Sequence, residues 1–353
     1  MIEQLENWLA LSHVSGIGPA KFQKYLLADP ELNILPKALK PDWAAVRRDL
    51  SWLSKGNCNA ILTLLDEQYP PLLKKIANPP PILYITGNKD LLTRPQIAMV
   101  GSRNAQPYGI QQAFDFASYL TRLGLVVTSG LALGIDSASH KGALATATGH
   151  TIAVLGHGLD TVYPAANTEL AEIIAARGVL VSEFAIGVAP LPRHFPQRNR
   201  IISGLSLGVL VVAAALKSGS LLTAEAALEQ GREVFAIPGS IHSADVKGCH
   251  KLIRQGEAKL VETVEDIIEE LGGLLKYMVS DTTAKTLSHG TTKQSLVSDY
   301  ECILNKIDFD MTSVDSIVAS SGLSVSEVSA KLLQLELDGY IMAVPGGFTR
   351  KLG

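Results

Sequence analysis

The chain has 353 residues, of which 47% are hydrophobic and 18% are charged, and its formal net charge at pH 7 is −3. This composition is typical of a well-packed protein and excludes a disordered chain, while the length predicts two or three domains. The longest apolar run, Leu207 to Leu216, is ten residues and too short to cross a membrane. The N-terminus carries Glu3 and Glu6 and no basic segment, so no secretory signal is predicted.

The cysteines Cys58, Cys249 and Cys302 lie far apart in the sequence and form no C-x-x-C pair. Neither a disulfide framework nor a zinc site is indicated, so we expect no metal or other cofactor and a reduced, cytoplasmic protein. Acidic and basic residues are nearly balanced along the chain, and a nucleic-acid partner would therefore need a local basic cluster. The segment Arg193–Arg200 is such a cluster, with three arginines and no acid.

Residues 1–90 predict a small helical domain. Gly16-Ile-Gly18 followed by Pro19 is typical of a helix–hairpin–helix, in which the hairpin amides can meet a DNA phosphate. Small helical folds also use Gly-x-Gly simply to turn tightly, and both interpretations stay open. The run Asn78–Pro81 predicts a rigid connection into a strand at Ile82–Thr86, which we expect at a sheet edge because proline is tolerated there.

Residues 91–272 alternate between apolar strands and helices. The predicted strands are Ile97–Gly101, Leu125–Ser129, Thr151–Leu155, Val179–Phe184, Val209–Ala213 and Glu233–Ile237. The predicted helices are Tyr108–Leu123, Ile135–Thr148, Asn167–Arg177, Asn199–Leu205 and Leu221–Gln230. Continuous apolar strands separated by helices predict an α/β fold, a doubly wound, Rossmann-like parallel sheet with helices on both faces. Its ligand is expected at the carboxyl edge of the strands.

Three glycine-containing turns fall at that edge. The candidate residues are Gly101, Ser102 and Arg103 in the first turn, Ser129, Gly130 and Gly134 in the second, and Lys217, Ser218, Gly219 and Ser220 in the third. Glycine lets the backbone approach an anion closely, and helix N-termini present free N–H groups, so the turns predict a site for several phosphates. The alternatives are a surface arginine at Arg103 and ordinary helix capping at Ser220.

The basic cluster adds Phe195, Arg198, Asn199 and Arg200 to the candidate site. We expect alanine at Arg103, Arg198, Arg200 or Lys217 to weaken binding without unfolding the chain, because side chains at loop ends leave no cavity when removed. One of Arg198 and Arg200 could instead pair with Glu183 or Asp136. Phe195 could belong to the core or serve as a stacking platform for an unpaired base.

Asp136 and His140 lie four residues apart on one predicted helix, a spacing that a hydrolase could use. No third group or nucleophile is spaced to complete a catalytic set, so no enzymatic activity is predicted. We expect Asp136 to hold the second glycine turn by hydrogen bonds, with His140 packed beneath it.

The polar residues 273–296 predict a linker, and residues 297–353 predict a winged helix-turn-helix. Its third helix is expected at Ser326–Asp338, and a hairpin at Tyr340–Thr349. This domain carries eight acids against four bases, so duplex DNA would repel it. We expect it to bind protein, either a partner or a second copy of the chain, or to modulate access to the core.

Six motifs occur in order along the chain: Val100-Gly-Ser-Arg103, Ser129-Gly-Leu-Ala-Leu-Gly-Ile-Asp136, Ala153-Val-Leu-Gly156 with Tyr163-Pro164, Phe195-Pro-Gln-Arg-Asn-Arg-Ile-Ile202, Ser218-Gly-Ser-Leu-Leu-Thr-Ala224 and Ile237-Pro-Gly-Ser240. Together they resemble the DNA-processing protein A family (DprA, also called Smf). The resemblance implies a helix–hairpin–helix or SAM-like start, an extended Rossmann core and a C-terminal winged helix. It also implies a homodimer that binds and protects incoming single-stranded DNA in natural transformation and loads the recombinase RecA onto it.

The chain departs from the family pattern at three positions: Ala213 replaces an acid, His250 an asparagine and Ala185 a proline. None of these removes a phosphate-facing group, but the first puts in doubt any role of the missing carboxylate.

Two other classes compete with this interpretation. A nucleoside-monophosphate phosphoribohydrolase would need Pro-Gly-Gly-x-Gly-Thr-x-x-Glu, where this chain has Ser218-Gly-Ser-Leu-Leu-Thr-Ala-Glu225, and a nicotinamide dehydrogenase would need Gly-x-Gly-x-x-Gly after Gly101. A duplex-DNA transcription regulator is suggested by the winged helix alone.

Overall fold

The computed structural model describes residues 2–56 and 58–272 and, beyond these, residues 306–307, 312–321, 323, 325, 328, 331–332, 335, 341–344 and 347–350. Residues 1–282 form one compact unit and residues 283–353 form a second. The predicted linker 273–296 and most of the predicted helix Ser326–Asp338 lie outside the described residues.

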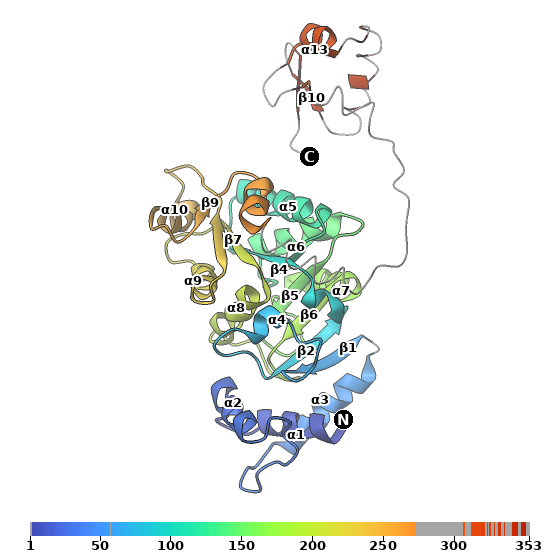
Figure 1. Ribbon diagram of the computed structural model, residues 1–353, viewed down its shortest axis with the longest axis vertical. Coiled ribbons are helices and arrows are strands. Elements are labelled where there is room, and N and C mark those ends of the chain that lie inside the picture. Colours follow the sequence, from blue (N-terminus) through green and yellow to red (C-terminus); the bar gives the residue numbers. More distant parts are fainter. Residues whose placement is uncertain are drawn as a thin grey trace. The chain divides into compact units, whose positions relative to one another are not determined.

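One mixed sheet organises the described part of the first unit (Figure 1). Its strands are β1 (Asn59–Thr63), β2 (Ile82–Gly87), β3 (Gln96–Gly101), β4 (Val126–Ser129), β5 (Thr151–Leu155), β6 (Val179–Ser182), β7 (Gly208–Ala213), β8 (Glu233–Ala236) and β9 (Lys259–Leu260). Their order is β1-β2-β6-β5-β4-β3-β7-β8-β9, and all neighbours from β6 to β9 are parallel. The chain winds away from β3 in both directions, so the order reverses between β3 and β7.

Helices cover both faces of this sheet. They are α1 (Ile2–Ser12), α2 (Pro19–Ala28), α3 (Trp43–Lys55), α4 (Pro71–Lys74), α5 (Pro107–Arg122), α6 (Ile135–Ala145), α7 (Thr168–Arg177), α8 (His194–Leu205), α9 (Leu221–Glu229) and α10 (Lys247–Arg254), and residues 264–272 are also helical. Alternate residues of a strand point to opposite faces. In β3, Ile97 and Met99 therefore share a core with α5 and α6, whereas Ala98 and Val100 share one with α8 and α9.

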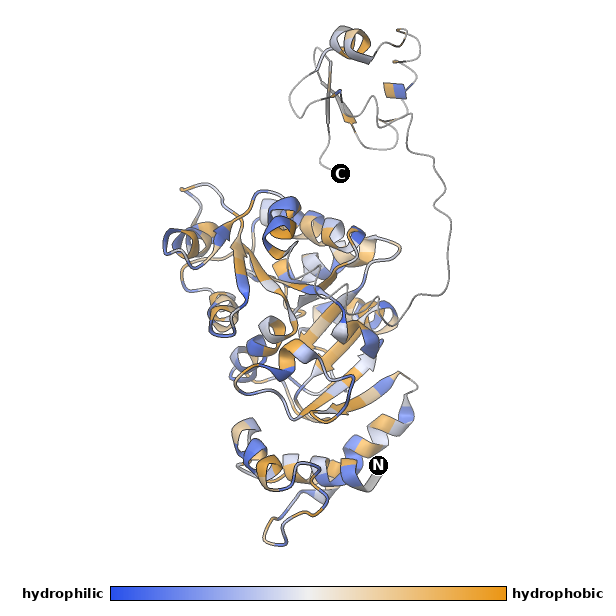
Figure 2. Ribbon diagram, viewed as in Figure 1, coloured by the Kyte–Doolittle hydropathy of each residue, from blue (hydrophilic) through white to orange (hydrophobic). Residues whose placement is uncertain are grey.

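Hydrophobic residues are concentrated along the central strands (Figure 2), as expected for strands that are buried on both faces. The six strands predicted for residues 91–272 are confirmed as β3 to β8. No helix in the described ranges is both long and apolar enough to cross a membrane.

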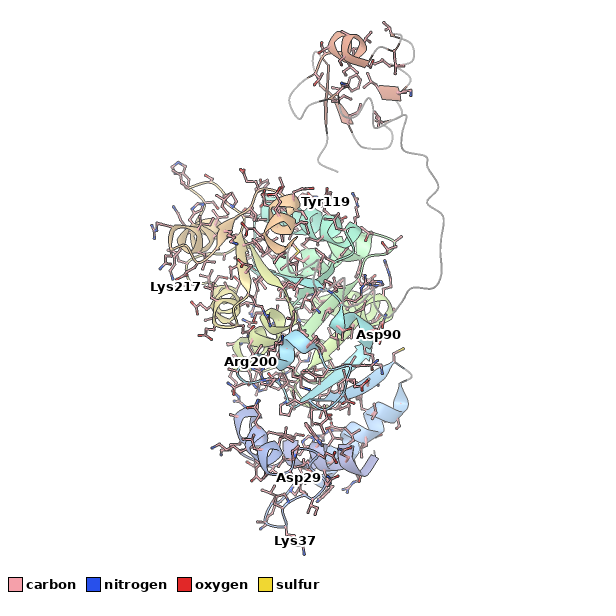
Figure 3. The ribbon with its side chains drawn as sticks, in the orientation of Figure 1. Asp29, Lys37, Asp90, Tyr119, Arg200 and Lys217 are labelled. Carbon is pink, nitrogen blue, oxygen red and sulfur yellow. The ribbon has the colours of Figure 1, made fainter. Side chains whose placement is uncertain are left out.

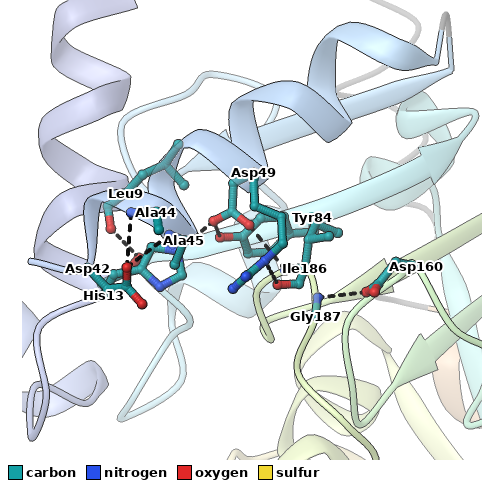
Figure 4. Close-up of polar contacts among 12 residues, drawn as sticks. Leu9, His13, Asp42, Ala44, Ala45, Asp49, Tyr84, Asp160, Ile186 and Gly187 are labelled. Carbon is teal, nitrogen blue, oxygen red and sulfur yellow. Dashed lines mark hydrogen bonds and ion pairs between the residues drawn. The ribbon is translucent and has the colours of Figure 1, made fainter.

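The N-terminal helices are tied to the sheet by one buried carboxylate (Figure 4). Asp49 of α3 is fully buried, and its Oδ2 lies 2.7 Å from His13 Nε2 and accepts a hydrogen bond of 2.6 Å from the Tyr84 hydroxyl of β2. Its Oδ1 accepts a bond from the Ile186 amide, and the neighbouring Arg48 donates to the Ile186 carbonyl at 2.9 Å. The helical region thus fixes the loop that follows β6.

Two sequence expectations for the sheet and helices are wrong. The strand at Ile82–Thr86 is not at an edge, because β1 pairs with β2 in antiparallel fashion and takes that place. The helix expected at Asn199–Leu205 begins earlier, at His194, so most of the basic cluster is helical. The division near residue 90 stays a prediction, but β1 and β2, which precede it, belong to the sheet.

The second unit contains α13 (Val314–Ser321) and a hairpin of β10 (Ile341–Val344) and β11 (Gly347–Arg350). Its described core includes Ile307, Ile317, Val328, Leu332, Leu335 and Ile341. The hairpin agrees with the one expected at Tyr340–Thr349.

Candidate phosphate-binding site

A cavity of about 640 Å³ opens at the carboxyl ends of β3 and β7, where the strand order reverses. This is the switch point at which doubly wound sheets bind their ligands. Ten of the sequence-predicted site residues line it: Gly101, Ser102, Arg103, Phe195, Arg198, Asn199, Lys217, Ser218, Gly219 and Ser220. Ser129, Gly130, Gly134 and Arg200 do not line it.

The turn after β3 brings its backbone close to β7 and α6. A Cβ on Gly101 would lie 2.5 Å from Ile135 Cγ1 and 2.8 Å from the Ala213 carbonyl, so no side chain fits there. The Ser102 amide donates to that same Ala213 carbonyl at 2.7 Å. Arg103 then projects from an exposed position, where its charge is available to an anion in the cavity.

The second glycine turn lies behind the first and supports it. Gly134 has φ of +76°, and a Cβ there would lie 2.3 Å from the Ser102 carbonyl. As expected, the Asp136 carboxylate holds this turn, because its Oδ2 accepts the amides of Gly130 and Ala132 at 3.2 and 3.3 Å. Burial raises the pKa of Asp136, while the nearby charge of Arg198 opposes that shift.

Below Asp136 on the same helix, His140 is fully buried, also as expected, and its Nδ1 lies 2.7 Å from Thr151 Oγ1. Burial, reinforced by the charge of Arg198, lowers the pKa of His140 to about 3. The imidazole is therefore neutral at physiological pH and packs as part of the core. Ser129 is likewise turned inward and donates to the Met99 carbonyl at 2.6 Å.

Arg198 forms the inner wall of the cavity and is only 4% exposed. Its Nη1 donates to the Val154 carbonyl at 2.7 Å, and its Nε has no hydrogen-bond partner within the described residues. A Cβ on Gly130 would lie 1.8 Å from Nη1, so this glycine makes room for the guanidinium. The expectation that Arg198 sits at a loop end is wrong, because it is buried inside α8.

Arg200 lies on another side of α8 and forms an ion pair with Glu183, in the loop after β6. Only 19% of the Arg200 side chain and 5% of the Glu183 side chain are exposed. The alternative of an ion pair with Glu183 is therefore confirmed for Arg200, whose expected position at a loop end is also wrong. Figure 3 labels it on α8, well separated from Lys217.

An aromatic pair stands at the mouth of the cavity. The rings of Phe195 and Tyr163 are 5.7 Å apart between centroids, and the Arg103 guanidinium lies 5.6 Å from the Phe195 centroid. Tyr163 is 47% exposed and lines the cavity, yet sequence reasoning gave it no role. The sequence signal that could have indicated a role for Tyr163 was the Tyr163-Pro164 motif. Offset rings with an adjacent cation can stack an unpaired base.

The turn after β7 completes the site. Lys217 is exposed, and the hydroxyls of Ser218 and Ser220 lie 2.7 Å apart. Ser220 precedes α9 but makes no side-chain cap, which removes the ordinary capping explanation for its hydroxyl. Asn199 Nδ2 donates to the Gly219 carbonyl at 3.4 Å and so links α8 to this turn.

Exposed cations, hydroxyls and backbone turns at a switch point, next to the aromatic pair of Phe195 and Tyr163, mark a Rossmann-like protein with a candidate phosphate-binding cavity. The family model of DNA recombination-mediator protein A matches residues 60–272, and that of the DprA winged helix domain matches residues 288–347. The chain belongs to this DNA-processing family, and its C-terminal part is a winged helix domain.

Relatives agree with that assignment. Protein Smf of Escherichia coli is 43% identical over 87% of this chain and 81% of its own length, and DprA of Bacillus subtilis is 46% identical over 72% and 91%. The structure of DprA from Streptococcus pneumoniae matches with a TM-score of 0.60 and 41% identity over 72% of this chain and 83% of that one. A structure of Helicobacter pylori DprA, described by its single-stranded-DNA binding mode, matches with a TM-score of 0.55 and 30% identity, over 60% and 95%.

Proposed function

We propose that the chain binds single-stranded DNA in the cavity between β3 and β7, mainly through phosphates and with little dependence on sequence. The observation that carries this proposal is the meeting of Arg103, Lys217 and the Phe195–Tyr163 pair at one cavity. The two cations match a phosphate backbone, and the rings match bases that are not paired. The single-stranded-DNA binding described for the Helicobacter pylori relative supports it.

The cavity shape favours a strand over a duplex. The walls come from α8, the starts of α6 and α9 and the loops after β3, β4, β5, β6 and β7, and the exposed cations Arg103 and Lys217 lie on loops, not on a helix or ribbon of the kind that enters a major groove. Affinity should fall with salt, because each neutralised phosphate releases counterions.

Binding is measured by fluorescence anisotropy with labelled single- and double-stranded oligonucleotides over a range of salt concentrations. We expect the single strand to bind more tightly and its affinity to decline as salt increases. A preference for duplex, or affinity independent of salt, would contradict the proposal.

We further propose that the protein acts as a cytoplasmic homodimer in natural transformation, protecting incoming single strands and loading RecA onto them without turnover of its own. The family's description as a recombination mediator supports this role. The direct test is RecA filament assembly on coated single strands, with and without the protein, together with ATP hydrolysis by the protein alone. Hydrolysis without RecA, or no acceleration of assembly, would count against it.

A further inference from the structure

A second cavity lies on the other side of α8, between the N-terminal helices and the loop after β6. Its volume is about 270 Å³, and its lining includes Ile17, Phe22, Glu183, Phe184, Val188 and Gln197. No lysine or arginine lines it within the described ranges. The cavity is therefore unsuited to phosphate, and its apolar and aromatic walls suit a flat ring.

One polar atom of this cavity is unsatisfied. The Glu183 side chain is 5% exposed; its Oε2 is held by Arg200, while its Oε1 has no hydrogen-bond partner in the part of the chain that the structure describes. Leaving a buried acceptor unpaired costs free energy, so a ligand with an N–H group would be favoured there. The Gln197 side chain lies near the same carboxylate and favours its charged form.

Phe184 supplies a fixed aromatic wall beside this carboxylate. Its ring is stacked on His194 at 4.3 Å between centroids. The loop that carries Phe184 is anchored by Asp49 and Arg48 through the Ile186 backbone. The wall is thus preorganised rather than formed by the ligand.

The two cavities share α8 as a partition. Pro196 and Asn199 line the first cavity, and Gln197, between them in sequence, lines the second. A helix is only about 10 Å across. The exposed Arg193 lies one turn before Gln197, in position to neutralise a phosphate that crosses the helix.

From this geometry we propose that the second cavity holds one unpaired nucleobase of the strand whose phosphates occupy the first, with a preference for an amino-bearing base at this one position, while the phosphate contacts remain independent of sequence. The inference rests on the proposed binding of single-stranded DNA. Glu183 Oε1 accepts a hydrogen bond from the cytosine N4 amino group, whereas thymine presents a carbonyl oxygen at that position.

The test compares oligo-dC with oligo-dT of equal length by anisotropy, because the two pyrimidines are similar in size. We expect the wild-type chain to bind oligo-dC roughly three- to tenfold more tightly, the range for the net contribution of one hydrogen bond made in exchange for one to water. Val188→Trp fills the cavity and should reduce oligo-dC affinity to that of oligo-dT. Leu123→Trp, at an exposed apolar position away from both cavities, should keep the preference.

A second variant, Glu183→Gln, removes the charge and should also abolish the preference; if it fails to fold, Val188→Trp still decides. Equal binding of the two oligonucleotides by the wild-type chain, or a preference that survives Val188→Trp, overturns the inference. Lys217→Ala should weaken both oligonucleotides equally. Failure of the wild-type chain to bind either one would instead overturn the proposed function, so the two failures are distinguishable.

Discussion

The turns after β3 and β7 and the helix α8 carry the same kinds of cationic side chain in opposite environments. Arg103 and Lys217, in the turns, are exposed and have no ion pair within the described residues. Arg198 and Arg200, on α8, are respectively buried against Val154 and paired with Glu183. Only the first pair is free to exchange water for the proposed phosphate at little cost, whereas Arg198 forms the inner wall of the cavity and Arg200 lies outside it.

The comparison shows that a place in a basic sequence cluster does not by itself tell whether an arginine binds a ligand or supports the fold. Burying a guanidinium costs free energy unless hydrogen bonds and a nearby opposite charge compensate it. Removing it therefore leaves those surrounding groups without a partner and destabilises the fold. Burial lowers the pKa of Arg198 to about 10, against the raising effect of Asp136, and the side chain still remains charged at neutral pH. We therefore expect Arg198 to influence the proposed binding through the shape and electrostatic potential of the cavity.

The largest effect is expected from Arg198→Ala. The change leaves the Val154 carbonyl without its donor, Asp136 without its compensating charge, and a void beneath Gly130. We expect the free energy of unfolding to fall by roughly 2–4 kcal/mol, together with loss of DNA binding. Urea denaturation followed by circular dichroism measures the first. A variant with wild-type stability would show that Arg198 belongs with the exposed cations instead.

Burial of His140, which lies close to Arg198, should also make the free energy of unfolding depend on pH. Its pKa is about 3 in the folded chain and about 6.5 when unfolded, so the unfolded chain binds the extra proton between these values. Stability is therefore complete above pH 6.5 and falls as the pH drops towards 3, by roughly 2 kcal/mol from pH 7 to pH 5.

Asp136 acts in the opposite direction, because its raised pKa makes the folded chain bind a proton first on acidification. The His140 effect is isolated by comparing the wild-type chain with His140→Asn, whose amide can replace Nδ1 beside Thr151. The difference in unfolding free energy between the two proteins should shrink from pH 7 to pH 5. A difference that stays constant between pH 7 and pH 5 would mean that His140 takes up its proton equally in the folded and the unfolded chain.

A smaller effect is expected from the exposed cations. Arg103→Ala and Lys217→Ala should each weaken single-strand binding roughly fivefold to tenfold and reduce the salt slope by about one, with unchanged stability. Lys141→Ala, which removes an exposed lysine of α6 outside the cavity, is the matched control. If the Lys141 variant weakens binding equally, overall charge rather than the cavity determines affinity.

The sequence was sufficient for the strands β3 to β8 and for the turns at their carboxyl ends, because apolar strand runs and glycine placement are local signals. It was insufficient for α8. Whether Arg198 or Arg200 points inward depends on which side of the helix meets the sheet, and that is decided by the packing of Ile201 and Ile202 against the strands. Similarly, β1 was missed because the apolar segment between Asn59 and Thr63 is short and is separated from its partner, β2, by a loop that contains α4.

Tyr163 is another residue whose role could not be predicted from the sequence. It stands at the cavity only because the segment after β5 returns towards α8, a tertiary arrangement without a periodic signature. The role of Asp136, by contrast, could be predicted, since it accepts amides of the turn that directly precedes its own helix, and His140 follows one helical turn later on the same side.

The smallest effect is expected from the winged helix domain. Residues 297–353 carry eight acids and four bases, namely Asp299, Glu301, Asp308, Asp310, Asp315, Glu327, Glu336 and Asp338 against Lys306, Lys331, Arg350 and Lys351. Such a domain gains little from a polyanion. A chain ending after Gly273 should therefore bind single-stranded DNA within about twofold of the full-length affinity, because the phosphate contacts that we propose all lie in the cavity.

The comparison is made by anisotropy on both proteins at the same salt concentration, with thermal unfolding as the check that the shortened chain is folded. Light scattering on both proteins asks in addition whether the domain joins two copies of the chain. Retained DNA binding with loss of a protein contact supports a protein-interaction role for the domain. Loss of DNA binding from a folded shortened chain would show instead that the domain, despite its net charge, contributes to the strand through the basic pair Arg350-Lys351.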